Sequence, residues 1–309
     1  MRLYRTFASL PKPAAIRPRA VAIGVFDGLH IGHRAILDRA RAAADDLGGS
    51  SLVLTFEPTP KEFFSPETAP PRLTRFRERF ELLEALGLDE LLCAKFGVVR
   101  ELSAHAFIDD LLVARLGARH VVVGDDFRFG ADRSGTVEEL RSHGRHHGLA
   151  VEEVPPVYWN GERVSSTAIR LALKNGDLAA ARAMLGRDYS ISGRVVRGLG
   201  LGRKLGFPTA NVNLQRLQAP IDGIFAARVT GLGSVPLDGV ASVGTRPTIG
   251  GGTALLEVFI FDFDRDIYGQ YITVHFLKRL REERHFDDLA ALQRQMHIDV
   301  AAARAALAD

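Results

Sequence analysis

The stretch Val21–His33, which reads VAIGVFDGLHIGH, decides the fold of the first half of this chain. Its apolar start predicts a buried strand, and its glycines predict a sharp turn into an amphipathic helix. Free amide N–H groups at a helix start attract anions, most often phosphate. His30 and His33 lie three residues apart, so both imidazoles can face one ligand there. This arrangement predicts a site that stabilises charge on a phosphate under attack.

Length and composition indicate a globular protein of two domains that acts on small molecules. The 309 residues exceed most single cores, and the net charge of +3 indicates no dedicated surface for nucleic acid. A single cysteine, Cys93, excludes an intrachain disulfide and suits a reducing compartment. We find no targeting segment and no apolar run that could span a bilayer. We therefore expect a cytoplasmic protein without a membrane partner, as a monomer or a weak homo-oligomer.

The first half alternates short apolar strands with amphipathic helices. This rhythm predicts an α/β domain, a Rossmann-like parallel sheet covered by helices on both faces. Ligands of such sheets bind beyond the carboxyl ends of the strands, where the loops Thr55–Pro60 and Gly124–Gly130 fall. The strands that follow the first are predicted at Ser51–Phe56, Leu91–Phe96, His120–Gly124 and Leu149–Val154, and the later helices at Arg75–Leu86, Ala104–Leu116, Glu138–His147 and Leu178–Leu185.

The second half has a different rhythm, of strands separated by Gly, Pro and Asp turns. It predicts an antiparallel barrel or sandwich, with a hairpin turn at Asp264–Gly269 between two strands. Asp287–Leu307 is predicted as a closing helix, whose inner face carries Leu289, Leu292, Met296 and Val300. We place the linker near Gly186, which divides the chain into domains 1–186 and 187–309.

Two further segments of the first half carry chemistry. Asp125 and Asp126 follow a strand directly, and can bind a ribose hydroxyl, a metal or an adenine amine, or merely cap a turn. Arg163 and Arg170 bracket three hydroxyl residues before a helix. Such hydroxyls usually cap the helix, and the two guanidinium groups suit a polyphosphate leaving group.

In the second half, a glycine-rich stretch precedes three candidate catalytic oxygens. Backbone approach at Gly198, Gly200 and Gly206, together with Arg203, suits a phosphate lid, although a flexible hairpin loop has the same composition. Thr209 and Asn211 supply neutral oxygens two residues apart, so both can face one Mg²⁺ ion. Glu257 lies in an apolar strand, either on its wet face or facing a site as general base.

Three histidines, at positions 143, 146 and 147, gather near the end of a predicted helix. Zinc binding is one interpretation. The absence of nearby Cys and the glycines on either side favour a solvated helix end instead.

The first half resembles the nucleotidyltransferase superfamily, and within it the FMN adenylyltransferase module of bacterial bifunctional riboflavin kinase/FAD synthetases. The motifs that carry the resemblance are Gly24-x-Phe26-Asp27-Gly28-x-His30-x-Gly32-His33, Phe56-Glu57-Pro58, Leu73-Thr74 with Glu78-Arg79, Gly124–Gly130 and Arg163–Arg170. One departure is Thr59, where the family often has His.

This resemblance implies roles for individual residues. His30 and His33 would stabilise the transferring phosphate, and the leaving pyrophosphate would be held by Arg163, Ser166, Thr167 and Arg170. Phe56 would contact the flavin. The remaining nucleotide contacts would come from Gly24, Phe26, Asp27, Gly32 and Asp126.

The second half resembles riboflavin kinase, a six-stranded barrel. The matching motifs are Gly206–Asn211, Gly244–Thr248, the Glu257 strand, Asp262 through Gly269, and Leu280-Arg281-x-Glu283-x-x-Phe286. The resemblance implies that Thr209 and Asn211 hold Mg²⁺, that Glu257 is the general base and that Arg281 contacts the flavin. Gly198, Gly200, Arg203 and Gly206 would contact the nucleotide.

Together the two resemblances imply a bifunctional enzyme. Riboflavin and ATP would give FMN and ADP, and FMN and ATP would then give FAD and pyrophosphate, each with Mg²⁺. One alternative is an adenylyltransferase of single activity with an accessory barrel, in which Thr209, Asn211 and Glu257 would be idle. Another is a flavin-sensing protein built on an inactive synthetase, which should have lost these same residues.

Overall fold

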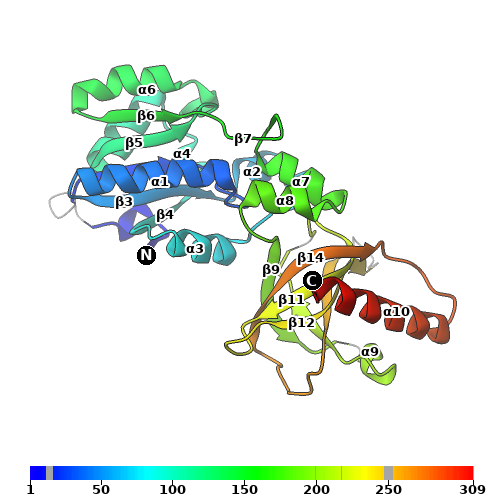
Figure 1. Cartoon of the computed structure of the whole chain (residues 1–309). Helices are drawn as coiled ribbons and strands as arrows, with labels where there is room; N and C mark the ends of the chain where they lie inside the picture. The colour runs from blue at the N-terminus through cyan, green and yellow to red at the C-terminus, as the bar shows by residue number, and fades with distance from the viewer. Residues whose placement is uncertain (12–16, 199, 217, 247–252, 309) are drawn as a thin grey trace. The chain divides into compact units, whose positions relative to one another are not determined.

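A parallel sheet and a closed barrel organise the chain in the computed structural model (Figure 1). The structure describes residues 1–11, 17–198, 200–216, 218–246 and 253–308. The chain forms two compact units. Unit 1 comprises Met1–Pro70 and Arg79–Val164, and unit 2 comprises Pro71–Glu78 and Ser165–Asp309. The boundary between the two units therefore lies after residue 164, upstream of the change in sequence rhythm near Gly186.

The sheet of unit 1 has six parallel strands in the order β1-β4-β3-β2-β5-β6. This confirms the predicted fold of the first half. The edge strand β1 was not predicted, because three residues are too few for a hydrophobic period. The strands are β1 (Arg2–Tyr4), β2 (Arg19–Ile23), β3 (Ser50–Glu57), β4 (Glu90–Lys95), β5 (Ala118–Gly124) and β6 (Ala150–Val154).

Helices cover this sheet, and α1 (Ile31–Asp46) packs across β2, β3 and β5. Its buried stripe includes Leu37, Ala40 and Ala43, as the amphipathic pattern predicts. The predicted helices are confirmed, although the one at Ala104–Leu116 divides into α5 and a π-helix. The other elements are η1 (Phe7–Ser9), α2 (Pro60–Phe64), α3 (Phe76–Ala85), α4 (Phe96–Val99), α5 (Ala104–Ala106), η3 (Phe107–Arg115), η4 (Ala131–Arg133), α6 (Val137–Gly144), η5 (Arg145–His147), β7 (Tyr158–Trp159) and β8 (Glu162–Arg163).

Unit 2 contains a closed antiparallel barrel in the order β10-β13-β12-β11-β14-β9. The barrel interpretation is therefore confirmed over the sandwich. Two helices, α7 (Ser166–Lys174) and α8 (Leu178–Leu185), pack on each other, and α8 contacts β14. The strands are β9 (Ser190–Val196), β10 (Thr209–Asn213), β11 (Gly223–Thr230), β12 (Leu237–Arg246), β13 (Thr253–Ile260) and β14 (Tyr271–Arg281), with the short helix α9 (Leu201–Lys204) between β9 and β10.

The predicted hairpin between the last two strands is wrong. β13 pairs with β10 and β12, whereas β14 pairs with β11 and β9. The connection at Asp264–Gly269 therefore joins strands that are not neighbours. Gly269 N donates to Val195 O at 2.9 Å, so this connection ends against β9 instead of closing a two-strand turn.

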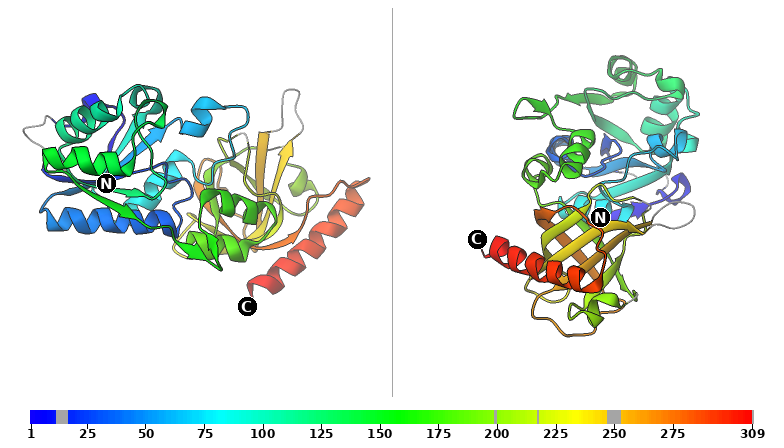
Figure 2. Two further views of the ribbon diagram at one scale, coloured as in Figure 1. Left: turned by 90° about the horizontal axis from the view of Figure 1, so that it is seen from above. Right: turned by 90° about the vertical axis from the view of Figure 1, so that its right-hand side faces the viewer.

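The closing helix α10 (Leu289–Leu307) runs along the outside of the barrel (Figure 2) and contacts β11, β12 and β14. Asp288 caps its start, because the side chain accepts from Ala291 N at 2.6 Å. Met296 and Val300 face the barrel as predicted. The prediction for Leu289 is wrong, since it is 55% exposed at the first helical position, where the stripe has not yet reached the barrel.

The segment Pro71–Glu78, called the 71–78 segment below, is bound into unit 2. Glu78 is its anchor, and accepts hydrogen bonds from Ser192 N at 2.8 Å and from Arg216 Nη2 at 2.8 and 3.1 Å. Tyr189 Oη donates to Leu73 O at 3.1 Å. Glu78 and Arg216 are both buried, so the segment is held by a desolvated ion pair.

Candidate functional site

The turn between β2 and α1, which the sequence predicted, has a strained backbone just before the two histidines. Phe26 and Leu29 have φ angles of 52° and 43°, values that non-glycine residues adopt only at a cost. Phe26 is buried, and the carbonyl of Val25 accepts a hydrogen bond from Arg79 Nη1 at 2.9 Å. The surrounding contacts thus hold a turn that the sequence alone disfavours, as is common at functional sites.

His30 caps helix α1, and its ring stacks on that of His33. The side chain of His30 accepts from His33 N at 3.2 Å, and the two ring centroids are 3.6 Å apart. A Cβ at Gly32 would lie 3.2 Å from His30 Nδ1, which explains the glycine between the two histidines. A Cβ at Gly24 would likewise lie 3.0 Å from the Phe26 ring. The structure therefore brings together the residues of the predicted nucleotide motif.

His33 is a neutral imidazole at physiological pH. Burial lowers its pKa well below the ordinary value, and the nearby His30 and Arg79 lower it further. Its Nδ1 atom is buried and makes no hydrogen bond within the described part of the chain. A neutral imidazole has one N–H, which can donate to a phosphate oxygen at the helix start.

The acidic loop after β5 meets Arg163. Arg163 Nη2 lies 2.5 Å from Asp125 Oδ1 and 3.7 Å from Asp126 Oδ2. β5 is the neighbour of β2 in the sheet, and the strand order reverses between them. Ligands of open α/β sheets bind at such a switch point, so His30, Asp126 and Arg163 belong to the edge where a nucleotide is expected.

Ser166, Thr167 and Arg170 open helix α7 and are part of unit 2, whereas the histidines and Arg163 are part of unit 1. The cap of α7 is Ser165, whose hydroxyl accepts from Ala168 N at 3.1 Å. Arg170 Nε donates to Pro71 O at 2.7 Å, so this arginine also holds the 71–78 segment. The predicted pyrophosphate site therefore stays a prediction.

Phe56 lies in the core of unit 1, edge to face with Phe96. The predicted flavin contact of Phe56 gains no support from this position. The exposed rings nearby are Phe63 and Phe64, which the sequence did not single out, at 39% and 62% exposure. Thr59 caps α2, because its hydroxyl accepts from Glu62 N at 3.4 Å, and this accounts for a hydroxyl residue where the family often has His.

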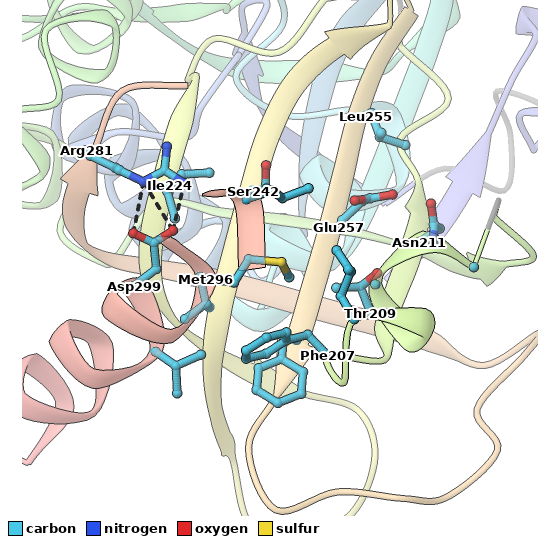
Figure 3. Close-up of a pocket in the computed structure, with 17 residues that line it drawn as sticks. Phe207, Thr209, Asn211, Ile224, Ser242, Leu255, Glu257, Arg281, Met296 and Asp299 are labelled. Carbon is cyan, nitrogen blue, oxygen red and sulfur yellow. Dashed lines mark hydrogen bonds and ion pairs between the residues drawn. The ribbon is translucent and has the colours of Figure 1, made fainter. Parts of the chain in front are cut away.

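A second candidate site is a cavity of about 330 Å³ on the outside of the barrel. Strands β10 to β14, helix α10 and the loop after β9 line it. Figure 3 shows Glu257, Thr209 and Asn211 on one side of it and Arg281 with Asp299 on the other. Leu256 and Val258 are fully buried, so Glu257 faces the opposite way, toward the cavity. This resolves which face of the strand Glu257 occupies.

Asn211 and Glu257 are direct partners in the β10–β13 ladder, and Thr209 lies on the same face of β10. Asn211 Oδ1 is buried and makes no hydrogen bond within the described residues. Such an orphaned oxygen, beside a hydroxyl and a carboxylate, fits a hard cation that prefers oxygen ligands. The three side chains therefore suit Mg²⁺ held jointly by protein and phosphate oxygens.

Close packing requires glycine in the loop between β9 and β10, which lies beside Thr209 and Asn211. A Cβ at Gly198 would lie 2.3 Å from Asn211 Nδ2, and one at Gly202 would lie 3.1 Å from Thr209 Oγ1. Gly200 and Gly206 have positive φ angles of 71° and 89°. The loop contains the turn α9 and lines the cavity, and its role as a phosphate lid stays a prediction. Arg203 is exposed on it.

Arg281 forms a bidentate ion pair with Asp299 of α10. Arg281 Nε lies 2.9 Å from Asp299 Oδ1, and Nη2 lies 2.7 Å from Oδ2. The pair is part of the cavity wall, so a flavin contact by Arg281 stays a prediction. Pro247 and Thr248 of the Gly244–Thr248 motif lie outside the described residues.

Comparison with known proteins assigns both halves. Residues 12–168 match the family model for FAD synthetase, and residues 185–307 match that for riboflavin kinase. A bifunctional riboflavin kinase/FMN adenylyltransferase from Pseudomonas fluorescens is 47% identical over 92% of this chain and 91% of its own length. The chain belongs to the bifunctional riboflavin kinase/FMN adenylyltransferase family. The Escherichia coli K12 member is 44% identical over the same shares of the two chains.

A solved structure shares the fold of this member of the bifunctional family. It is named as a macrolide-efflux protein from Streptococcus pneumoniae, has a TM-score of 0.82 and 32% identity, and the match covers 96% of both chains. Among the described residues of our chain, no helix has the length and apolarity needed to cross a membrane.

Two residues that line the barrel cavity were given no role by sequence reasoning, although one of them, Phe207, belongs to the Gly206–Asn211 motif. Asp299 is buried on α10 and pairs with Arg281, and Phe207 packs edge to face on Phe259. An acidic residue on the expected buried stripe was the available signal for Asp299, because buried carboxylates are nearly always paired.

Proposed function

We propose that this chain phosphorylates riboflavin at the barrel cavity and adenylylates FMN at the carboxyl edge of the sheet, with ATP as donor in both steps. The observation that carries the proposal is the alignment of Glu257, Asn211 and Thr209 on one wall of the cavity, in a chain whose relatives are named for both activities. Both reactions take small molecules as substrates. A cytoplasmic location and a monomeric or weakly associating state remain expectations.

In the kinase step, Glu257 accepts the proton of the riboflavin hydroxyl as its oxygen attacks the γ-phosphorus of ATP. The bond from that phosphorus to the bridging oxygen breaks, which gives FMN and ADP. Thr209 and Asn211 would hold Mg²⁺, which neutralises charge on the phosphates when it is bound. Gly198, Gly200, Arg203 and Gly206 form the loop that we assign to the phosphates, because its backbone approaches Asn211 closely.

In the adenylyl step, an oxygen of the FMN phosphate attacks the α-phosphorus of ATP, and pyrophosphate leaves. His30 and His33 stand at the start of α1 and donate to the phosphate oxygens as charge develops. We assign the leaving pyrophosphate to Arg163, Ser166, Thr167 and Arg170. Gly24, Phe26, Asp27 and Asp126 would line the nucleotide from the two loops at the switch point, and Gly32 would do so from the first turn of α1.

We assign adenylylation to residues 1–186 and phosphorylation to residues 187–309. The ranges of the two family models, 12–168 and 185–307, support this functional division. The compact units divide the chain differently, because the 71–78 segment and residues 165–186 are part of the unit that contains the barrel.

The experiment is a reciprocal pair of variants, each assayed for FMN formation from riboflavin and for FAD formation from supplied FMN. Glu257→Gln should lower FMN formation by about a hundredfold to ten-thousandfold, the usual contribution of a general base. His33→Ala should lower FAD formation by about a hundredfold or more, the contribution of one donor at a transferring group. Each variant should retain the other activity.

Glu282→Gln is the matched control, because this barrel carboxylate is 83% exposed. It should leave both reactions unchanged. FMN formation near the wild-type rate in Glu257→Gln would remove the general base from the proposal. Loss of both activities in a variant with an unchanged circular dichroism spectrum would contradict two separate sites.

A further inference from the structure

A cluster of metal-ligating side chains lies in unit 1, outside both proposed sites. Asp109, His143 and His147 place one ligand atom each within 4.8 Å of one another. The Nε2 atoms of both histidines lie 2.8 Å from the same oxygen, Asp109 Oδ1. Among the described residues, this is the group of His, Asp and Glu side chains that meets the distance requirement for a metal ion.

Two packed helical segments create this convergence. His143 and His147 are four residues apart, on α6 and its continuation η5, so they share one face. Asp109 lies on the π-helix η3, which packs against α6. The three side chains are 26%, 34% and 36% exposed, so an ion can reach them from solvent.

Two more potential ligands flank the cluster at the same spacing. His105 precedes Asp109 by four residues, and its ring centroid is 4.5 Å from that of His143. Glu139 precedes His143 by four residues, and its Oε1 lies 3.9 Å from His105 Nε2. Each helical segment therefore presents ligating residues to the other, and His105, whose side chain is 66% exposed, is a candidate for a fourth ligand beside the three that converge.

We propose that Asp109, His143 and His147 bind one Zn²⁺ ion, with His105 or water as the fourth ligand. Two or three imidazoles with one carboxylate form a donor set that suits Zn²⁺ and is a poor match for Mg²⁺, which prefers oxygen ligands. Zinc bonds of about 2.0 Å in a tetrahedron place ligand atoms about 3.3 Å apart. The present contacts of 2.8 Å need only a small opening to reach this spacing.

The ion has a structural role in this proposal. It joins η3 to the end of α6 through Asp109 and His143, which are 34 residues apart in the chain. A ligand that binds the folded form alone raises the apparent stability with the logarithm of its concentration once that exceeds the dissociation constant. Neither half-reaction uses these side chains, so the site is an addition to the flavin chemistry.

The test is titration of the full-length, chelator-treated protein with Zn²⁺ by calorimetry, in the presence of excess Mg²⁺. The wild type should bind one equivalent. Asp109→Asn and His147→Gln should each weaken binding by at least tenfold, since even the outer partners of metal ligands change affinity by about 10–100-fold. His146→Ala is the control, because its ring centroid is 6.2 Å from that of His143 and it is not a proposed ligand.

Thermal unfolding provides a second readout that needs no enzyme activity. Added Zn²⁺ should raise the melting temperature of the wild type and of His146→Ala, and should not raise that of His147→Gln or Asp109→Asn. The proposal is overturned if the wild type binds no stoichiometric zinc. It is equally overturned if Asp109→Asn and His147→Gln bind zinc as tightly as the wild type, because the ion would then occupy another site.

Discussion

Replacement of Glu78 by Gln should destabilise unit 2 more than any other single carboxylate change on helix α3. The carboxylate of Glu78 is buried and accepts bonds from Ser192 N, from the Ser192 hydroxyl at 3.2 Å and from Arg216 Nη2. The amide of Gln can still accept from Ser192. It cannot neutralise Arg216, whose side chain is only 5% exposed.

The expected loss of stability follows from the charge of Arg216, which is left buried without its ion-pair partner. Removal of one partner of a buried ion pair costs about 3–5 kcal/mol, and the lower end applies because the amide keeps some hydrogen bonds. A loss of about 3 kcal/mol moves the urea midpoint by roughly 1–3 M, since m is about 1–3 kcal/mol per M. Glu84→Gln is the matched control on the same helix, because Glu84 is 51% exposed and should change stability by about 0.5 kcal/mol or less.

The assay is urea unfolding followed by far-UV circular dichroism, on the single variants and on the double variant Glu78→Gln/Arg216→Met. The double variant should recover much of the lost stability, because it removes the unpaired charge. A midpoint for Glu78→Gln no lower than that for Glu84→Gln would refute the reasoning. So would a double variant in which the two losses simply add.

Three further predictions concern the two units separately. Gly198→Ala should lower FMN formation by about a hundredfold and spare FAD formation, because its Cβ would displace Asn211. Gly233→Ala is the control and should leave both reactions unchanged, because a Cβ there meets nothing within 4 Å. Equal rates of FMN formation in the two variants would contradict the packing argument. Because the pKa of His33 is lowered in the folded protein, this imidazole takes up a proton below about pH 6.5 in the unfolded chain but not in the folded one. The contribution of His33 to folding stability is therefore full above that pH and is lost as the pH drops. Urea midpoints at pH 8 and pH 5.5 should therefore differ less in His33→Gln than in the wild type, and an equal difference would exclude this source. A fragment of residues 165–309 should unfold at a higher urea concentration than one of residues 187–309, because it keeps α7 and α8, and identical midpoints would show that these helices add nothing.

Local patterns were sufficient to predict most elements of both units. The β2 turn and α1 were predictable because a buried strand, glycines and a helical stripe follow one another within 30 residues. The partners of β13 were not, since strand pairing depends on contacts between distant segments and a turn-rich connection resembles a hairpin. The exposed Leu289 was assigned to the buried stripe of α10 because its helical spacing fits, but the contact of this helix with the barrel begins one turn later.

The candidate sites were likewise predictable in part: the types of residue were, whereas their positions in space were not. The types of residue at Thr209, Asn211 and Glu257 indicated phosphoryl transfer, but the face occupied by Glu257 was undecided, because strict alternation allows either. Burial of Leu256 and Val258 inside the barrel decides it. The zinc proposal depends on Asp109, which no pattern around His143 could indicate from 34 residues away.

The 71–78 segment also imposes an order on synthesis. A ribosome completes Glu78 before any of its partners from the barrel, since Ser192 follows 114 residues later and Arg216 follows 138 residues later. At about 5–20 residues per second, the carboxylate waits roughly 7–28 s for that arginine. Unit 1 can therefore assemble its sheet on the ribosome while eight residues from within its own sequence stay hydrated, and unit 2 becomes complete only when the emerging barrel captures them.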